Sequence, residues 1–291
     1  MRIILVRHAD PDYKTGLLTE KGKREAKIIG ERAKKWVGQI DEIYVSPLQR
    51  ARDTAAPIEE ALGMKAVVLP WLEEFRASVR PEVASNKALS WDFLPTLWTK
   101  DPLLYDKDHW TESSVMTPPE GNIGATACLK ETADGLESIL AAHGVLREGN
   151  YYRYGDPDPR ALDILKKGCV HREITQTPEE AAAIMASWPV HPERETYEKT
   201  VVLVCHMAIS FVMLGYLLGI SFVPLVEGMF IAPTGVTVLN NESVLSLVEN
   251  RWVKKGDAVG FRTQYIGDVR HLVEAGEPIS GRGSFASIFT D

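Results

Sequence analysis

The first part of the chain alternates short apolar runs with longer amphipathic stretches. Continuous apolar or β-branched runs at 2–6, 41–46 and 65–70 predict strands, and the first of them reads as a strand buried on both faces. Between them, 18–38 and 46–63 predict helices. Strand–helix–strand units of this length favour a parallel sheet with helices on both faces.

Local signals at the two predicted helices support this interpretation. In the first, apolar or small residues recur at intervals of three and four from Ala26 to Val37, and Gly38 is expected to end the helix. In the second, we expect Ser46 to act as the N-cap, Pro47 to take the first helical position and Gly63 to end the helix.

The regular pattern stops between residues 76 and 199, which are rich in proline and aromatic residues. Helices are predicted at 127–143 and 177–187. A stretch of this length is too long for a structureless loop. We therefore interpret it as an insertion folded over the top of the sheet, with a poorly ordered linker as the alternative. Its aromatic residues form either the insertion's own small core, which we favour, or the wall of an apolar pocket, and they are Trp91, Phe93, Trp98, Trp110, Tyr151, Tyr152 and Tyr154.

The sheet pattern returns after the insertion. Residues 200–206 predict a strand that leads into a helix, 235–240 and 243–249 predict two further strands, and 250–272 predict a short polar strand and a tail. The apolar segment from Ala208 to Leu225 is about as long as the shortest membrane spans. Its serines, glycines and proline, and the lack of flanking Lys/Arg clusters, favour a buried helix of a soluble protein.

Composition narrows the function classes. The 291 residues are 45% hydrophobic and 25% charged, and the net charge of −7 gives no sign of a nucleic-acid-binding surface. Three cysteines far apart in sequence, Cys128, Cys169 and Cys205, argue against a disulfide framework or a zinc site. With only a short apolar run at the N-terminus, we expect a cytoplasmic protein that binds neither nucleic acid nor membrane.

Charged and polar side chains follow the predicted strands at the edge where parallel sheets bind ligands. Because these residues come from four separate places in the sequence, they are expected to converge only after folding. The strand ends carry Arg7 and His8, then Ser46 with Arg50 on the next helix, then Glu73 and Glu74, and finally Cys205 and His206.

These stretches resemble the histidine phosphatase superfamily, also called phosphoglycerate mutase-like. The matching sequences are LVRHA, LTEKGKREA, YVSPLQRARDTA, LEE, VLVCHM, GVTVL and YIGDVRHL, which lie within residues 1–76 and 200–272. The resemblance implies an α/β fold, a three-layer α/β/α sandwich with a mostly parallel central sheet. Residues 1–75 and 200–291 would form the core, and residues 76–199 a large cap inserted over the active site.

The resemblance also implies roles for the convergent side chains. His8 would attack phosphorus and become a phosphohistidine, His206 would stabilise the developing charge, and Arg7 and Arg50 would hold the phosphoryl oxygens. The family's acid follows the third strand, which favours Glu74 as general acid and base, with Glu73 as the alternative.

Two further residues are expected at the phosphate. Lys14 lies near the position of the family's phosphate-binding Asn, and Met207 begins the helix after His206 in place of a usual glycine. If this interpretation is right, the His8 ring lies within about 10 Å of both Arg50 and His206, because all must share one ligand.

The predicted function is phosphatase activity on a small phosphorylated substrate, without a metal or organic cofactor. A phosphoglycerate-type mutase is the first alternative, but the usual mutase extension of the N-terminal motif is absent. A non-catalytic module that binds a phosphorylated ligand is the second alternative. Arg76 and Arg80 follow the acid and either meet a second anionic group of the substrate or are solvated. The sequence predicts neither the identity of the substrate nor the oligomeric state.

Overall fold

A computed structural model describes residues 1–84, 89–154, 199–248 and 251–284 of the chain. Its strands are β1 (Arg2–Arg7), β2 (Glu42–Val45), β3 (Val67–Val68), β4 (Val145–Glu148), β5 (Tyr151–Tyr154), β6 (Thr200–Cys205), β7 (Val236–Val248) and β8 (Arg251–Asp268). Its α-helices are α1 (Glu20–Ala33), α2 (Gln49–Leu62), α3 (Pro95–Trp98), α4 (Ala125–Ala142), α7 (Met207–Leu218), α8 (Phe222–Gly228) and α9 (Arg270–Glu274). The predicted helix at 177–187 lies outside the described residues.

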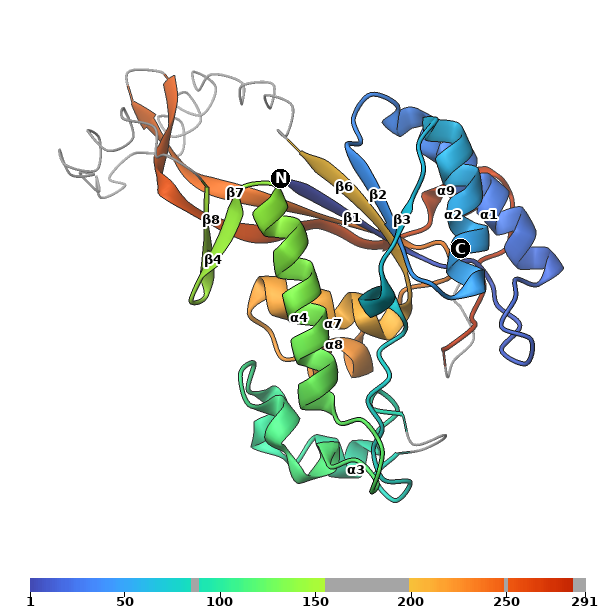
Figure 1. Cartoon of the computed structure of the whole chain (residues 1–291), viewed down its shortest axis with the longest axis vertical. Helices are drawn as coiled ribbons and strands as arrows, with labels where there is room; N and C mark the ends of the chain where they lie inside the picture. Colours follow the sequence, from blue (N-terminus) through green and yellow to red (C-terminus); the bar gives the residue numbers. More distant parts are fainter. Residues whose placement is uncertain (85–88, 155–198, 249–250, 285–291) are drawn as a thin grey trace, which may run out of the picture.

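One sheet runs through the molecule in the order β3-β2-β6-β1-β7-β8-β5-β4. The strands β3, β2, β6 and β1 pair in parallel, with Arg7 at the end of β1 opposite Cys205 at the end of β6. From β7 onward every pairing is antiparallel. Figure 1 shows β7 and β8 reaching far beyond the parallel part of the sheet.

The predicted α/β sandwich is confirmed, and the structure corrects several details of it. The predicted strands at 235–240 and 243–249 are the single strand β7, and the predicted short polar strand after residue 250 is the long strand β8. The N-cap of α2 is Leu48 rather than Ser46, although Gly63 does end the helix with a φ of 64°.

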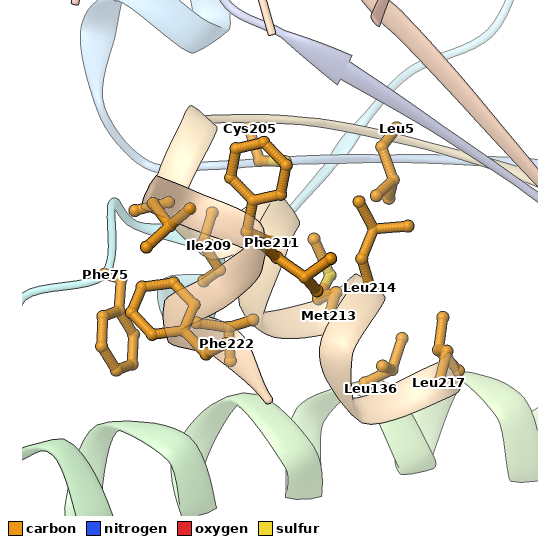
Figure 2. Close-up of a cluster of buried hydrophobic side chains, with 14 of the residues drawn as sticks. Leu5, Phe75, Leu136, Cys205, Ile209, Phe211, Met213, Leu214, Leu217 and Phe222 are labelled. Carbon is orange, nitrogen blue, oxygen red and sulfur yellow. The ribbon is translucent and has the colours of Figure 1, made fainter. Parts of the chain in front are cut away.

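Alternate residues of β1 face the two layers of helices. Ile4 and Val6 pack with α1 and α2 on one face, whereas Ile3 and Leu5 pack with α7 on the other. Figure 2 shows part of this second core, where Leu5 and Cys205 of the sheet lie above Phe211 and Leu214 of α7. The alternation explains why the strand is apolar throughout, because both of its faces are buried.

The described part of the region from 76 to 154 joins this second core. Leu136 of α4 packs near Leu217 of α7, and Phe75, Trp110 and Phe222 form a cluster of tilted aromatic rings. Among the aromatic residues noted in the sequence, Phe93, Trp110 and Tyr152 are buried core residues and Tyr151 is exposed. The division of the chain into a core and a cap remains a prediction.

The apolar segment after His206 consists of helices α7 and α8, separated by a turn at Gly219, which has a φ of 66°. Nearly every side chain of α7 is buried between the sheet and α4. In the part of the chain that the structure describes, no helix has both the length and the apolar character needed to cross a membrane.

Candidate active site

The carboxyl ends of β1 and β6 bring His8 and His206 together. The backbone N–H of His8 donates to the carbonyl of Cys205 at 2.9 Å, which continues the parallel pairing past the end of the strands. The two imidazole rings are both buried, and their centroids lie 5.0 Å apart at an angle of 56°. This distance is well within the separation expected from the sequence.

Helix α2 supports the turn that carries His8. Thr54 accepts a hydrogen bond from the backbone N–H of Ala9 at 2.9 Å and donates to the carbonyl of Arg50 at 2.7 Å. The buried hydroxyl of Thr54 therefore connects the turn after His8 to Arg50, which lies one turn earlier on α2. Because Thr54 is fully buried, this connection is shielded from water.

The hydrogen bond of His8 defines its tautomer. Nδ1 lies 2.7 Å from the carbonyl oxygen of Ala9, which can only accept, so Nδ1 carries the proton and Nε2 has a free lone pair. Burial lowers the pKa of His8 well below its ordinary value, and the nearby charges of Arg7 and Arg50 lower it further. The ring is therefore neutral at physiological pH.

Ser46 holds the second imidazole. Its hydroxyl lies 2.7 Å from Nε2 of His206 and accepts the backbone N–H of Leu48 at 3.2 Å. Burial lowers the pKa of His206 well below its ordinary value, and His8, Arg50 and Arg7 act in the same direction. Ser46, expected at the end of the second strand as a helix cap, instead contacts the ring of His206 and orients it.

Arg7 is a buried cation whose terminal nitrogens are already engaged. Nη1 donates to the carbonyl of Ile231 and lies 3.6 Å from the sulfur of Met207. Nη2 donates to the carbonyl of Arg282 at 2.8 Å and lies 3.4 Å from the hydroxyl of Tyr13. These contacts come from segments that are far apart in sequence, and together they fix the position of the guanidinium.

Three buried nitrogens in this region have no hydrogen-bond partner among the described residues. They are Nε of Arg7, Nε of Arg50 and Nδ1 of His206. A buried donor without a partner costs about 1–3 kcal/mol, so three such nitrogens in one region call for an explanation such as a bound ligand. Together they suit an anion with several oxygen atoms.

The structure separates the two candidate acids. Glu74 accepts the backbone N–H groups of Phe75 at 3.0 Å and of Ile209, on the first turn of α7, at 3.1 Å. Burial raises the pKa of Glu74, against the opposing effects of those two N–H groups and of Arg7 and Arg50. The carboxylate of Glu73 lies 3.7 Å from Arg76, and both of these side chains are more than one-third exposed.

Of the remaining predicted residues, only Met207 has a described contact with this group. Met207 is buried against Arg7, as described above. The side chain of Lys14 is exposed, and its backbone N–H donates to Asp12. Arg76 pairs with Glu131 at 2.6 Å, and Arg80 is exposed.

Sequence reasoning did not find Tyr13 or the backbone carbonyls that hold Arg7. Tyr13 adjoins the expected Lys14, so the position of the loop was nearly right but the residue was not recognised. The carbonyls of Ile231 and Arg282 have no signal in residue type, because every residue carries a carbonyl group.

Comparison with models of protein families finds a match in the N-terminal part of the chain. Residues 3–88 match the model of the histidine phosphatase superfamily (branch 1), which includes Arg7, His8, Arg50 and Glu74 but not His206. No curated protein sequence matches the chain with significance.

Solved structures extend the likeness to almost the whole chain. One titled mycobacterial hydrolase 1 has a TM-score of 0.50 at 17% identity and covers 92% of this chain and 98% of its own. A mycobacterial glucosyl-3-phosphoglycerate phosphatase has a TM-score of 0.50 at 16% identity, covering 92% of this chain and 99% of its own. At such identities the likeness establishes the fold.

Proposed function

We propose that the chain hydrolyses a small phosphomonoester through a phosphohistidine on His8, and the match of residues 3–88 to the histidine phosphatase superfamily model supports this. The observation that supports this most is the cluster of unpartnered nitrogens on Arg7, Arg50 and His206 around the neutral imidazole of His8. The solved structures similar to this one include a phosphatase whose substrate is a small phosphorylated compound, which supports the same substrate class.

Phosphate binding uses the nitrogens that have no partner among the described residues. A phosphomonoester carries about two negative charges. The N–H groups at Nε of Arg7 and Arg50 supply permanent positive charge to its oxygens. If Ser46 donates its hydroxyl proton to Nε2 of His206, the neutral ring carries its own proton on Nδ1 and donates it to a third oxygen.

Phosphoryl transfer then proceeds in two steps. Nε2 of His8 forms a bond to phosphorus as the bond to the leaving oxygen breaks, and Glu74 gives its proton to that oxygen. Water next attacks the phosphohistidine and loses its proton to Glu74. The P–N bond breaks, inorganic phosphate leaves, and His8 returns to its starting form.

Glu74 suits this double role because its pKa is raised. A protonated carboxyl is needed in the first step and a carboxylate in the second, and a pKa close to the working pH allows both. The hydrogen bonds from the N–H groups of Phe75 and Ile209 go to Oε1. Oε2 is therefore the oxygen that carries the mobile proton.

Two other predictions stay proposals. We propose that residues 76–199 form a cap that shapes the substrate pocket, since their described part packs against the helices next to the site. We also propose that the reaction needs no metal, because the arginines and His206 supply the positive charge that a metal would provide.

Two measurements test the proposal, namely the release of phosphate and the trapping of a phosphorylated protein. We expect release of inorganic phosphate from 4-nitrophenyl phosphate, and rapid quench with a ³²P-labelled substrate to trap acid-labile label on the protein. His8→Ala should abolish both. His109→Ala, which removes an exposed histidine, should abolish neither. Equal turnover in the protein and its His8→Ala variant would refute the hydrolase.

A further inference from the structure

The C-terminal segment from Glu277 to Ser284, here called the C-terminal strap, returns to the loop that follows β1 (Figure 1). Its first residue, Glu277, pairs with Arg24 at 2.9 Å and with Lys21 at 3.2 Å, both on α1. The hydroxyl of Ser280 then donates to the buried carboxylate of Asp10, and Arg282 lies 3.7 Å from the same carboxylate. The strap is therefore anchored at two points on the N-terminal part of the chain.

Past these anchors the strap reaches Arg7 with its backbone. The carbonyl of Arg282 accepts from Nη2 of Arg7 at 2.8 Å. Gly283 has a φ of 87°, and a Cβ at this position would lie 3.1 Å from Nη2. Both the conformation and the close approach favour glycine there.

Two carbonyls from separate segments of the C-terminal part of the chain consequently hold the guanidinium of Arg7. The carbonyl of Ile231 takes Nη1 and the carbonyl of Arg282 takes Nη2, while Nε is left buried without a described partner. A planar guanidinium held at both terminal nitrogens has a defined plane, so the direction of its Nε–H is set as well. Without the strap, the carbonyl of Ile231 would be the one strong acceptor left for the terminal nitrogens of Arg7 among the described residues.

We propose that the C-terminal strap is a positioning element of the active site, and that Ser280 and Glu277 act as positioning residues by placing the Arg282 carbonyl on Arg7. The strap would orient Nε–H of Arg7 toward the phosphoryl group before substrate arrives. This inference rests on the proposed function, because it assigns Arg7 to the phosphoryl group.

The energetic argument concerns the freedom of Arg7. Immobilising a flexible side chain on binding costs affinity, and a side chain already held in place avoids that cost. Loss of the strap contact should therefore weaken phosphate binding about three- to tenfold. The chemical step should change little, because the strap touches neither His8 nor Glu74 in the described contacts.

The test removes the anchors while leaving Arg7 in place. We would compare the double variant Glu277→Gln/Ser280→Ala, the single variant Gly283→Ala, and Glu274→Gln as a matched control whose carboxylate is exposed on α9. The measurements are the Kd for inorganic phosphate by calorimetry, KM and kcat with 4-nitrophenyl phosphate, and the Tm. Phosphate binding would also be measured in the His8→Ala background, where turnover plays no part.

The expected result is a three- to tenfold rise in Kd and KM for the double variant and for Gly283→Ala, with kcat within about twofold and Tm near that of the control. Values of Kd and KM equal to those of Glu274→Gln would overturn the proposal. Tighter phosphate binding would also overturn it, because it would mean that the strap blocks Arg7.

Failure of this inference can be told apart from failure of the proposed function. If phosphate binds but no His8-dependent turnover occurs, the hydrolase is wrong and the comparison of Kd values still decides the role of the strap. If turnover depends on His8 and the strap variants behave like the control, only the strap inference fails.

Discussion

The side chains of His8 and Glu74 show how burial changes the protonation of single residues. His8 is buried and Glu74 is partly buried, and burial shifts their pKa values in opposite directions. The pKa of the histidine falls and that of the carboxyl rises, so both groups favour their neutral forms. A neutral imidazole and a protonated acid are the combination that the proposed phosphohistidine formation requires, and both shifts favour it.

Glu74 and Glu73 are adjacent carboxylates, so a variant of Glu73 serves as the control for a variant of Glu74. Glu74→Gln keeps the acceptor for the N–H groups of Phe75 and Ile209 but cannot transfer a proton. We expect kcat for an alkyl phosphate to fall about 10²–10⁴-fold. The loss should be much smaller for 4-nitrophenyl phosphate, whose leaving group needs little protonation.

Glu73→Gln should leave both rates within about threefold, because it changes only an exposed ion pair with Arg76. Steady-state kinetics with the two esters decides between the residues. Similar losses in both variants, or a loss confined to Glu73→Gln, would reassign the acid.

Helix α1 shows how an element that carries no catalytic group still shapes the site. Its N-cap Thr19 also bonds Asp10, and its Gly22 lies directly against the backbone of that residue. A Cβ on Gly22 would lie 2.2 Å from the carbonyl oxygen of Asp10, two residues from His8. The helix therefore sets the path of the loop that follows His8.

Gly22→Ala should lower the free energy of unfolding by about 1–3 kcal/mol, because the backbone of Asp10 must move. It should also lower kcat/KM, since that movement shifts the turn at His8. Gly30→Ala is the matched variant, because its Cβ would meet Pro57 of α2 at 2.6 Å, away from the site.

Gly30→Ala should be destabilised similarly, yet its kcat/KM should stay within about twofold of the parent protein. Urea denaturation and kinetics on the folded fraction separate the two effects. Unchanged kcat/KM in a destabilised Gly22→Ala would show that α1 does not position the nucleophile.

The molecule as a whole carries buried acidic groups that tie its stability to pH. Glu25 of α1 is buried, and its Oε2 accepts the backbone N–H of Asp10 at 2.7 Å. Burial raises the pKa of Glu25 from 4.5 to about 7. The folded protein therefore binds more protons than the unfolded chain between these two values, so this group makes stability fall as pH rises through that interval.

Glu25→Gln should remove this contribution while keeping an oxygen for Asp10. At 1.36 kcal/mol per pH unit, the free energy of unfolding of the variant relative to the parent should rise by up to about 3 kcal/mol between pH 4.5 and 7. Glu31→Gln, on the exposed side of the same helix, is the control and should show no such trend. Parallel stability profiles for parent and Glu25→Gln would contradict the assignment.

His271 and Asp268 contribute to the pH dependence of stability with a sign opposite to that of Glu25. For this reason the prediction compares Glu25→Gln with the parent protein. Burial lowers the pKa of His271 to about 4, and hydrogen bonds from Arg270 help lower that of Asp268 to about 2 despite its burial. Both groups make the folded state more stable as pH rises, His271 between about 4 and its ordinary value of 6.5. Both groups are present in the parent protein and in Glu25→Gln, so their contributions cancel in the difference.

The sequence by itself determined the alternation of strands and helices in the parallel part of the sheet and the residue types at the strand ends. These features follow from local rules, because apolar periodicity and capping signals act over a few residues. The convergence of His8, Arg50, Glu74 and His206 followed from the same rules, since the carboxyl ends of parallel strands meet at one edge.

The tertiary structure decided what depends on contacts between distant segments. Only packing could show that β7 and β8 are long antiparallel strands, that Ser46 orients His206, or that Glu74 rather than Glu73 accepts a hydrogen bond from α7. The hydrogen bonding of Arg7 shows this most clearly, because its guanidinium donates to the backbone carbonyls of Ile231 and Arg282. A backbone carbonyl is the same in every residue, so its role is set by where the chain passes and not by which residue carries it.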